Sequence, residues 1–352
     1  MSATETVTLP GSLADKGGPA QALLIVKDLR KYFPVRGGIF GRRQAMVQAV
    51  DGVSFSVEKG ETLGIVGESG CGKSTTARLL IGLTEKDAGE IIFDGQGLGG
   101  ELSPRELRRG VQMVFQDSYA SLNPRLTIED SIAFGARVQG LDDPVGRAHR
   151  LMARVGLDPT RFAQRYPHEL SGGQRQRINI ARALAMSPRL VILDEAVSAL
   201  DKSVEAQVLN LLVDLRGEFG LTYIFISHDL NVVRYISDRI LVMYLGEVVE
   251  VGPVDAIWSA QAHPYTRSLF SAMPSMDPDN RTKTPPLSGD PPNPIDPPEG
   301  CRFHTRCRFA DSVCKTRAPK LLEMPQTPGH LAACHLHDPA SGHPKAGTEV
   351  MG

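Results

Sequence analysis

The sequence predicts an α/β fold in which a mostly parallel sheet is covered by helices on both faces, followed by a small Cys-rich C-terminal extension. Three observations carry this prediction. Short apolar runs alternate with helical stretches from Ala22 to about Gly252. A glycine-rich loop lies between one of these runs and a helical stretch. Beyond residue 253 the alternation stops, and prolines and cysteines become frequent instead.

Length and composition are those of a globular protein. The chain has 352 residues, 41% of them hydrophobic and 22% charged, and this length predicts about two domains. Its 39 basic and 40 acidic side chains give a formal net charge of -1, which excludes the broad cationic surface of a general nucleic-acid binder. We expect no membrane span, because no apolar run reaches 18 residues, and no secretory signal at the N-terminus. These features predict a chain that stays in the cytosol.

Seven short apolar runs are the expected strands of the sheet. They are residues 23–26, 62–66, 90–93, 111–115, 190–194, 222–227 and 239–244. Helices are expected at residues 73–82, 175–185 and 203–219. The last of these helices places its apolar side chains along one face, and Gly220 is its expected C-cap.

The two ends of the chain and one internal segment differ from this pattern. Residues 1–20 are small and polar, and we expect them to form a flexible tail. The proline-rich segment 284–300 is expected to be an extended, semi-rigid linker. It leads to a cluster of four cysteines and then to a polar tail over residues 338–352.

The clearest chemical motif is a phosphate-binding loop. Residues Gly67-Glu68-Ser69-Gly70-Cys71-Gly72-Lys73-Ser74-Thr75 fit G-x-x-x-x-G-K-[ST] in full, between an expected strand and an expected helix. Glycines let backbone N–H groups surround phosphates, and the helix N-terminus favours negative charge. Lys73 is expected to reach the β- and γ-phosphates, and Ser74 to ligate Mg²⁺. The loop therefore predicts a nucleotide site with Mg²⁺.

A pair of carboxylates supplies the second half of the expected nucleotide site. The apolar run 190–194 ends in Asp194, and Glu195 follows it. Asp194 is expected to hold Mg²⁺, directly or through water. Glu195 is expected to polarise the attacking water as general base.

A second candidate anion site precedes the expected helix at 175–185. It consists of Ser171, Gly172, Gly173 and Gln174, whose hydroxyl and amides would lie at a helix N-terminus. Taken alone, the motif is equally explained as a glycine-containing helix cap. Together with the phosphate-binding loop and the carboxylates, Leu170-Ser171-Gly172-Gly173-Gln174 resembles the signature sequence of ABC-type ATPases.

Further residues extend the resemblance to this family. They are Gln116 in VFQD, the segment 198–201 (SALD) and His228 after a strand, whereas Ala196 stands where the family commonly has proline. The resemblance implies a P-loop NTPase fold of the ABC ATPase type, with a mixed sheet core and a helical signature subdomain at about 117–186. It also implies that two such domains pair head to tail, so that each ATP lies between the P-loop of one and the signature of the other.

The same resemblance implies a role for each matching residue. Gln116 would contact Mg²⁺ and the attacking water and would sense the membrane partner. Asp201 would communicate across the dimer, and His228 would contact the γ-phosphate. Phe33 would stack on adenine, with Tyr32 as the close alternative.

Several longer segments are similar to the ATP-binding subunits of oligopeptide and dipeptide importers. They are YPHELSGGQRQR (166–177), the segment 225–250 that begins with FISHDL, HPYT (263–266) and GCRFHTRC (300–307). This resemblance covers about residues 22–337. It implies an ATPase domain over residues 21–260 and an importer-type C-terminal extension over residues 261–337.

The importer resemblance also implies a function and a set of partners. The chain would be an ATP-hydrolysing subunit that powers oligopeptide or dipeptide import at the cytoplasmic face of the bacterial inner or plasma membrane. Its partners would be transmembrane permease subunits, which dock on residues 118–127, a second ABC ATPase subunit, and an extracytoplasmic solute-binding protein. The same machinery with another cargo (nickel, glutathione or oligosaccharides) stays open, as does a soluble ABC ATPase. Soluble ABC ATPases usually carry tandem ATPase domains or long coiled-coil insertions, and this sequence has neither.

Four cysteines lie close together near the C-terminus. Cys301, Cys307, Cys314 and Cys334 are separated by five, six and nineteen residues. In a reducing compartment such clustering indicates metal binding more than disulfides. Structural zinc sites usually use pairs separated by two to four residues, whereas an iron–sulfur cluster also takes four thiolates and tolerates wider spacing.

The surroundings of these cysteines are basic. Arg302, Arg306, Arg308, Lys315, Arg317 and Lys320 lie among them in the sequence. A cationic shell would favour deprotonated thiols. Some importers of the subfamily that this sequence resembles carry a [4Fe–4S] centre here, so we expect that cluster, with zinc or free thiols as alternatives. Its expected role is structural or redox-sensing, without contact with ATP, and Cys71 is not expected to be a ligand.

Overall fold

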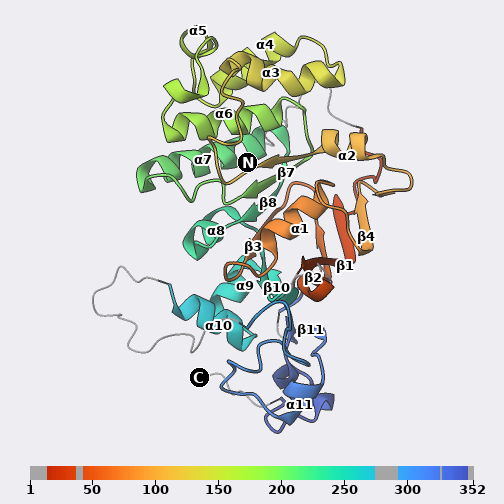
Figure 1. Ribbon diagram of the computed structural model, residues 1–352. Coiled ribbons are helices and arrows are strands. Elements are labelled where there is room, and N and C mark those ends of the chain that lie inside the picture. The colour runs from red at the N-terminus through yellow and green to blue at the C-terminus, as the bar shows by residue number, and fades with distance from the viewer. Residues whose placement is uncertain (1–13, 37–42, 274–291, 326, 348–352) are drawn as a thin grey trace.

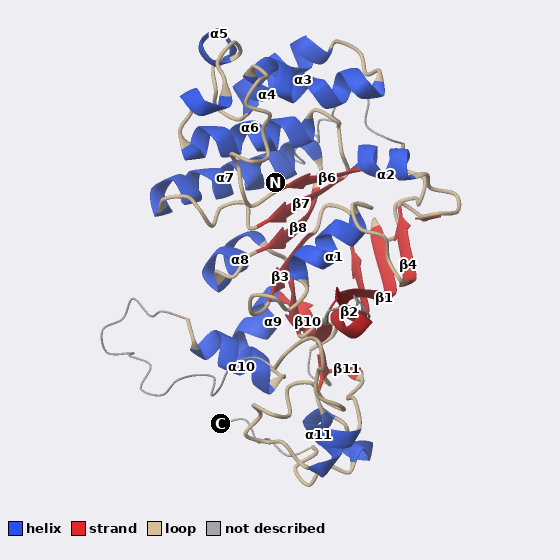
Figure 2. Ribbon diagram, in the orientation of Figure 1, coloured by secondary structure: helices blue, strands red, loops and turns tan. Residues whose placement is uncertain are grey.

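The computed structural model describes residues 14–36, 43–273, 292–325 and 327–347. Within these ranges the chain forms two sheets, a group of helices at one end and a loop-rich extension at the other end (Figures 1 and 2). Part of the expected proline-rich linker, residues 284–291, and the outermost parts of both expected tails lie outside the described residues. Within the described ranges, no helix has the length and the apolar character that crossing a bilayer requires.

The larger sheet combines parallel and antiparallel strands. Its members are β3 (Thr62–Val66), β6 (Val111–Val114), β7 (Leu190–Asp194), β8 (Thr222–Ile226), β9 (Arg239–Tyr244), β10 (Glu247–Pro253), β11 (Leu321–Glu323) and β12 (Leu331–Ala333). Their spatial order is β11-β12-β10-β9-β3-β8-β7-β6. The five strands from β9 to β6 are parallel, whereas β10, β12 and β11 are antiparallel to their neighbours. This confirms a mixed sheet, and strands β3, β7 and β9 match the expected runs residue for residue.

A smaller, antiparallel sheet corrects the expectation of one mostly parallel sheet. It contains β1 (Leu24–Arg36), β2 (Arg43–Val57), β4 (Ala88–Phe93) and β5 (Gln96–Gly97), in the order β2-β1-β4-β5. The apolar runs at 23–26 and 90–93 pair with each other here, with Ile25 opposite Ile92. Strand β2 follows β1 without the long crossover that a parallel pair needs, so an antiparallel arrangement results.

Helices cover the larger sheet and form the group at one end. The helices are α1 (Lys73–Leu80), α2 (Pro104–Gly110), α3 (Ile128–Gln139), α4 (Pro144–Arg154), α5 (Pro159–Phe162), α6 (Gly172–Leu184), α7 (Lys202–Phe219), α8 (Leu230–Ile236), α9 (Val254–Ser259), α10 (Pro264–Ser271) and α11 (Ser312–Thr316). Short 3₁₀ turns are η1 (Pro167–Glu169), η2 (His335–His337) and η3 (Pro339–Ser341). Helices α3 to α6 lie between β6 and β7 in the chain, within the range 117–186 where a helical subdomain is expected, and they stack away from the extension (Figure 1).

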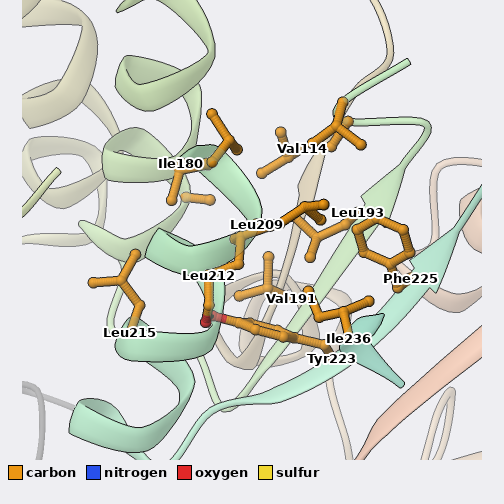
Figure 3. Close-up of a cluster of buried hydrophobic side chains, with 14 of the residues drawn as sticks. Val114, Ile180, Val191, Leu193, Leu209, Leu212, Leu215, Tyr223, Phe225 and Ile236 are labelled. Carbon is orange, nitrogen blue, oxygen red and sulfur yellow. The ribbon is translucent and has the colours of Figure 1, made fainter. Parts of the chain in front are cut away.

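Helix α7 joins the helices to the larger sheet through one buried face. Its side chains Leu212 and Leu215 pack with Val191 of β7 and Tyr223 of β8 (Figure 3). The Tyr223 hydroxyl donates a hydrogen bond to the Leu212 carbonyl oxygen at 3.1 Å, so this buried polar group has a partner. Gly220 ends the helix in the left-handed conformation (φ 62°), which confirms the expected C-cap.

Parts of both expected tails are held against the folded chain. The backbone N–H groups of Lys16 and Gly17 donate to the Asp94 carboxylate at 2.8 and 3.1 Å. At the other end, His343 Nε2 lies 2.9 Å from the Phe309 carbonyl oxygen, and the Gly347 N–H donates to the Leu336 carbonyl oxygen at 2.9 Å. The described parts of these tails are therefore packed, because backbone and side-chain polar groups find partners that the local sequence does not reveal.

We predict that Leu212→Ala lowers the free energy of unfolding by about 2–5 kcal/mol, because it leaves a cavity between α7 and the sheet. Val213→Ala is the matched control, since Val213 is 40% exposed, and its effect should stay within about 0.5 kcal/mol. Urea unfolding of the two variants measures the difference. Equal losses would mean that this interface does not stabilise the fold as described.

Candidate functional site: a nucleotide site and a four-cysteine cavity

The glycine-rich loop between β3 and α1 has a conformation that only glycine accepts readily. Gly67, Gly70 and Gly72 have φ values of 148°, 81° and 108°. A Cβ atom on Gly67 would lie 2.2 Å from the Met243 carbonyl oxygen, and one on Gly72 would lie 2.3 Å from the Ala49 carbonyl oxygen. Gly67 and Gly72 are thus required both by the backbone conformation and by the close approach of neighbouring strands, whereas Gly70 is required by the backbone conformation alone.

Lys73 is the first residue of α1, and its ammonium group lies over the loop. Nζ donates to the carbonyl oxygens of Gly67 at 2.7 Å and Glu68 at 3.0 Å, and the residue is 6% exposed. A phosphate bound in the loop would offer this cation a charged acceptor, which makes a stronger hydrogen bond than a carbonyl does. The position of Lys73 fits the expected phosphate-binding role.

The expected magnesium ligands and catalytic groups meet beside the loop. Ser74 Oγ donates to Asp194 Oδ1 at 3.0 Å. Burial raises the pKa of Asp194, and the Ser74 hydroxyl opposes that shift. Gln116 Nε2 donates to Glu195 Oε2 at 2.9 Å, and His228 Nδ1 lies 3.5 Å from the same oxygen. The hydroxyl, carboxylate and amide oxygens of this group are donors that suit Mg²⁺.

Glu195 has a strained backbone at the point where it joins this group. Its φ is 48°, in the left-handed region that glycine favours. Its N–H donates to the Ile226 carbonyl oxygen of β8 at 2.9 Å, and its own carbonyl oxygen accepts from Ser198 Oγ at 2.9 Å. Two hydrogen bonds thus hold the strained residue. Strain of this kind is found where a side chain must be directed for function, and here it falls on the expected general base.

The signature segment caps helix α6 at the protein surface. Ser171 Oγ accepts from the Gln174 N–H at 3.3 Å, and Gln174 Oε1 accepts from the Ser171 N–H at 3.0 Å. The helix-cap interpretation is therefore confirmed. Gly173 faces α7 closely, since a Cβ there would lie 2.5 Å from Val204 Cγ1. Ser171 and Asp201 are exposed, and no hydrogen bond or ion pair within the described ranges joins either of them to the loop at 67–75.

The two aromatic candidates for adenine stacking have different surroundings. The Tyr32 hydroxyl donates to Asp51 Oδ1 at 2.7 Å and accepts from Arg30 at 3.3 Å, so it belongs to an internal network. Phe33 is 39% exposed, and the Lys31 ammonium lies 5.5 Å from its ring centroid. Successive residues of a strand point to opposite faces. These surroundings favour Phe33 as the ring that is free to stack on a ligand.

The four C-terminal cysteines converge on one small cavity. Cys301 and Cys307 come from the loop before α11, Cys314 from α11 and Cys334 from the residue after β12, and all are free thiols. The lining also includes the apolar side chains of Phe303, Phe309, Leu336 and Pro264 and the imidazoles of His263, His304, His335 and His343. Across the described part of the chain, no group of three or more His, Cys, Asp or Glu side chains has the arrangement of a site for a metal ion.

The expected cationic shell around the thiols is wrong for its two most buried arginines. Arg302 forms ion pairs with Asp51 and with Glu247, the latter at 3.0 Å. Arg306 pairs with Glu68 at 2.9 Å. Both side chains are long enough to reach past the cysteines to acidic groups of the ATPase part. Burial consequently dominates at the thiols and raises the pKa of Cys301 and of Cys334 to about 12.

The extension contacts the phosphate-binding loop, which the sequence did not indicate. The Tyr265 hydroxyl accepts from the Glu68 N–H at 2.8 Å, and Arg306 pairs with the Glu68 carboxylate. Glu68 was expected to offer its amide to phosphate, but that amide is already used by Tyr265. No local pattern pairs residue 68 with residue 265 or 306, since the three lie in different elements and far apart in the sequence.

Comparison with known proteins gives matches over both parts of the chain. The ABC transporter family model matches residues 50–198, and the model of the oligopeptide/dipeptide transporter C-terminal region matches residues 249–314. The oligopeptide transport ATP-binding protein AppF of Bacillus subtilis is 50% identical over 325 residues, which cover 90% of this chain and 98% of that protein. The di/tripeptide transport ATP-binding protein DppF of Pseudomonas aeruginosa is 45% identical, with coverage of 90% and 98%.

Two solved structures have a similar fold. One is cbiO1 of Clostridium perfringens, part of the ABC transporter complex cbiONQ, with a TM-score of 0.59, 28% identity and coverage of 68% of this chain and 92% of that chain. The other is a dimeric ATP-binding cassette in a post-hydrolysis state with ADP and phosphate bound, with a TM-score of 0.57, 28% identity and coverage of 66% and 98%. Both support an ATP-hydrolysing cassette fold over about two thirds of the chain.

We predict that Glu195→Gln retains ATP binding but lowers kcat for ATP hydrolysis by about 10²–10⁴-fold, because the amide cannot accept a proton. Glutamine keeps the shape that contacts Gln116 and His228. Steady-state hydrolysis and nucleotide-binding titration measure the two effects. Glu90→Gln, at a side chain that is 68% exposed, is the matched control and should hydrolyse ATP normally. Near-normal hydrolysis by Glu195→Gln would refute its role as general base.

Proposed function

Because this chain belongs to the ABC transporter ATP-binding proteins of the oligopeptide and dipeptide type, we propose that it is the ATP-hydrolysing subunit of a bacterial peptide importer. The observation that carries this proposal is the occurrence of a complete nucleotide site and an oligopeptide-type C-terminal region in one chain. In this proposal residues 21–260 are the ATPase domain and residues 261–337 the importer-type extension.

The residues of the nucleotide site have distinct tasks in this proposal. The loop at 67–75 and Lys73 hold the phosphates of ATP, and Phe33 stacks on adenine. Ser74, Asp194 and Gln116 would hold Mg²⁺, which neutralises charge on the phosphates when it is bound. Glu195 accepts the proton of the attacking water, and Gln116, 2.9 Å away, orients its carboxylate.

His228 and the signature segment would contact phosphate in two different nucleotide sites, His228 in this chain's own site and the signature segment in that of a second subunit. The imidazole of His228 is next to Glu195 and is 64% exposed, so it is accessible to a γ-phosphate. Ser171 and the amides of Gly172 and Gly173 lie at the exposed start of α6, where they would complete the site of a second subunit. The similar solved cassette is dimeric, which supports the pairing of two such subunits. In this proposal the pairing is head to tail, with an identical or a homologous partner.

A groove beside the nucleotide site is suited to the membrane partner. This docking groove has a volume of about 870 Å³ and reaches from Ser74 and Asp194 to helix α3. Its apolar lining includes Leu83, Phe134 and Val138, which are 54%, 59% and 60% exposed. Exposed apolar side chains of this size mark a surface for a partner. We assign it, together with residues 118–127, to a cytoplasmic segment of the permease.

Gln116 lies between this docking groove and the general base. Its side chain lines the groove and donates to Glu195. Movement of the permease segment would therefore change the position of the Glu195 carboxylate through the side-chain amide of Gln116. Peptide delivered by an extracytoplasmic solute-binding protein would in this way control ATP turnover on the opposite face of the membrane.

The proposal includes a tetrathiolate centre at the four-cysteine cavity. Four free thiols are the donor set of an iron–sulfur cluster, which holds its ligands around a larger core than a single zinc ion does. Cys301, Cys307, Cys314 and Cys334 would hold a [4Fe–4S] cluster, with zinc as the alternative. Binding must displace protons, because burial raises the pKa of the Cys301, Cys307 and Cys334 thiols.

Reconstitution tests the proposed function directly. With its permease and partner ATPase in lipid vesicles, the chain should hydrolyse ATP faster when peptide-loaded binding protein is added. Phe134→Ser should abolish this stimulation, because it removes apolar surface from the docking groove. Val213→Ser, at an apolar side chain that is 40% exposed on α7, is the matched control and should keep it. Stimulation by a different solute and not by peptides would contradict the proposed cargo.

Anaerobic purification tests the metal centre. We expect about four iron and four acid-labile sulfide atoms per chain, with broad visible absorbance. Cys307→Ser should lose both, since it removes one thiolate, whereas Cys71→Ser in the phosphate-binding loop should retain them. Stoichiometric zinc without sulfide would show that the cysteines bind zinc and not a cluster. Absence of both iron and zinc would refute a metal centre at the four cysteines.

A further inference from the structure

The loop that carries Cys301 and Cys307 contacts the phosphate-binding loop at Glu68. Arg306 Nη1 lies 2.9 Å from Glu68 Oε2, and Nη2 lies 3.1 Å from Oε1, so guanidinium and carboxylate form two parallel hydrogen bonds. The two side chains are 6% and 21% exposed. A bidentate pair that is largely shielded from water is stronger and more directional than an exposed ion pair.

The backbone of Glu68 is held by the same extension. Its N–H donates to the Tyr265 hydroxyl at 2.8 Å. Tyr265 is fully buried, and its ring packs against Tyr244 at 4.5 Å and against Phe303 at 5.5 Å between centroids. The extension therefore fixes both the main chain and the side chain of one residue of the phosphate-binding loop.

Arg306 is tied to the cysteines through tight turns. The His304 N–H donates to the Cys301 carbonyl oxygen at 2.9 Å, and the Arg306 N–H donates to the Phe303 carbonyl oxygen at 3.0 Å. The Cys301 N–H in turn donates to the Cys314 carbonyl oxygen at 2.8 Å. These turns join the backbone of Arg306 to that of Cys301 and Cys314, so a rearrangement of the backbone at these cysteines would act on Arg306.

We propose that Arg306 is a positioning residue that couples the four-cysteine segment to ATP binding, by fixing Glu68 and with it the phosphate-binding loop. The link to the ligand is short, because Lys73 donates to the Glu68 carbonyl oxygen at 3.0 Å. A displaced Glu68 displaces the cation that reaches the phosphates. The inference rests on the proposed function, in which the loop at 67–75 binds ATP.

This coupling works in both directions. If the position of Arg306 changes the affinity for ATP, ATP binding must stabilise the segment 301–307 by the same free energy. The state of the cysteines, whether they hold a cluster, zinc or protons, would then set the ATP affinity of the subunit. The extension would report on metal supply or redox state without contacting the nucleotide.

Steady-state kinetics of the full-length protein test the effect of Arg306 on ATP affinity. Arg306→Gln removes the bidentate pair and should raise KM for ATP by about 5- to 150-fold, with the effect on KM and not on kcat. Arg308→Gln is the matched control, because it removes the same charge from the same loop. The Arg308 guanidinium lies over the Phe309 ring, 4.7 Å from the ring centroid. The KM of the Arg308→Gln variant for ATP should equal that of the wild type.

A double-mutant cycle separates this role from a general loss of structure. Glu68→Gln removes the carboxylate of the same ion pair. If the Arg306→Gln protein does not fold, Glu68→Gln takes its place in the measurement. The double variant should raise KM no more than either single variant does. Additive effects, or equal effects of Arg306→Gln and Arg308→Gln, would overturn the proposal.

Hydrogen exchange tests the reverse direction. In the Glu195→Gln background, ATP with Mg²⁺ should slow amide exchange in peptides that cover residues 301–309. Arg306→Gln should abolish that slowing, and Arg308→Gln should keep it. Unchanged exchange in a protein that binds ATP would overturn the coupling alone, whereas failure of the Glu195→Gln protein to bind ATP would overturn the proposed function as well.

Discussion

The close approach of the phosphate-binding loop to two strands is the constraint on which the nucleotide site depends. At Gly72 the loop lies against the Ala49 carbonyl oxygen of β2, in the smaller sheet. At Gly67 it lies against the Met243 carbonyl oxygen of β9, in the larger sheet. The loop thus fills the junction of the two sheets, where a Cβ on either of these two glycines would collide with backbone. Lys73 and Ser74 follow this junction directly, so their positions are set by packing that begins before the helix.

Parallel strand pairing brings the catalytic groups together across large sequence separations. In the register of β7 and β8, Asp194 lies opposite Ile226, and the next N–H, that of Glu195, donates to the Ile226 carbonyl oxygen. His228 comes two residues after Ile226, so it emerges at the same edge of the sheet as Glu195. Carboxyl ends of parallel strands form a common edge, and ligands of α/β proteins bind there. The sheet therefore gathers the carboxylates and the imidazole, while α1 supplies the hydroxyl.

The elements and the nucleotide residues could be predicted because their signals are local. Strand β7 is a continuous apolar run that ends in Asp194, and the glycines at 67, 70 and 72 mark the turn by themselves. The choice of partners between distant segments could not be predicted. Six basic residues lie among the late cysteines, and nothing local indicates that Arg302 pairs with Asp51 and Glu247 or that Arg306 pairs with Glu68. Ion pairing depends on which side chains the tertiary fold brings within reach. The order of the strands likewise depends on contacts between distant segments.

The extension shares the core of the ATPase part, and this limits how it can transmit a signal. Strand β12 pairs with β10, and Glu250 of β10, fully buried, accepts from the N–H groups of Ala262 and His263 at 2.8 and 2.9 Å and lies 2.7 Å from His330 Nε2. Moving the extension as a rigid body would break these buried polar contacts, and a buried carboxylate left without partners is costly.

The segment 301–307 has turns and no strand pairing, so side chains join it to the two sheets, through the ion pairs of Arg302 with Asp51 and Glu247 and the buried ring of Phe303. Since this segment carries two of the thiols, Arg306 and Phe303, the proposed path from the cysteines to the phosphate-binding loop is short. It runs through the Arg306 guanidinium to the Glu68 carboxylate, beside the packing of Phe303 on Tyr265.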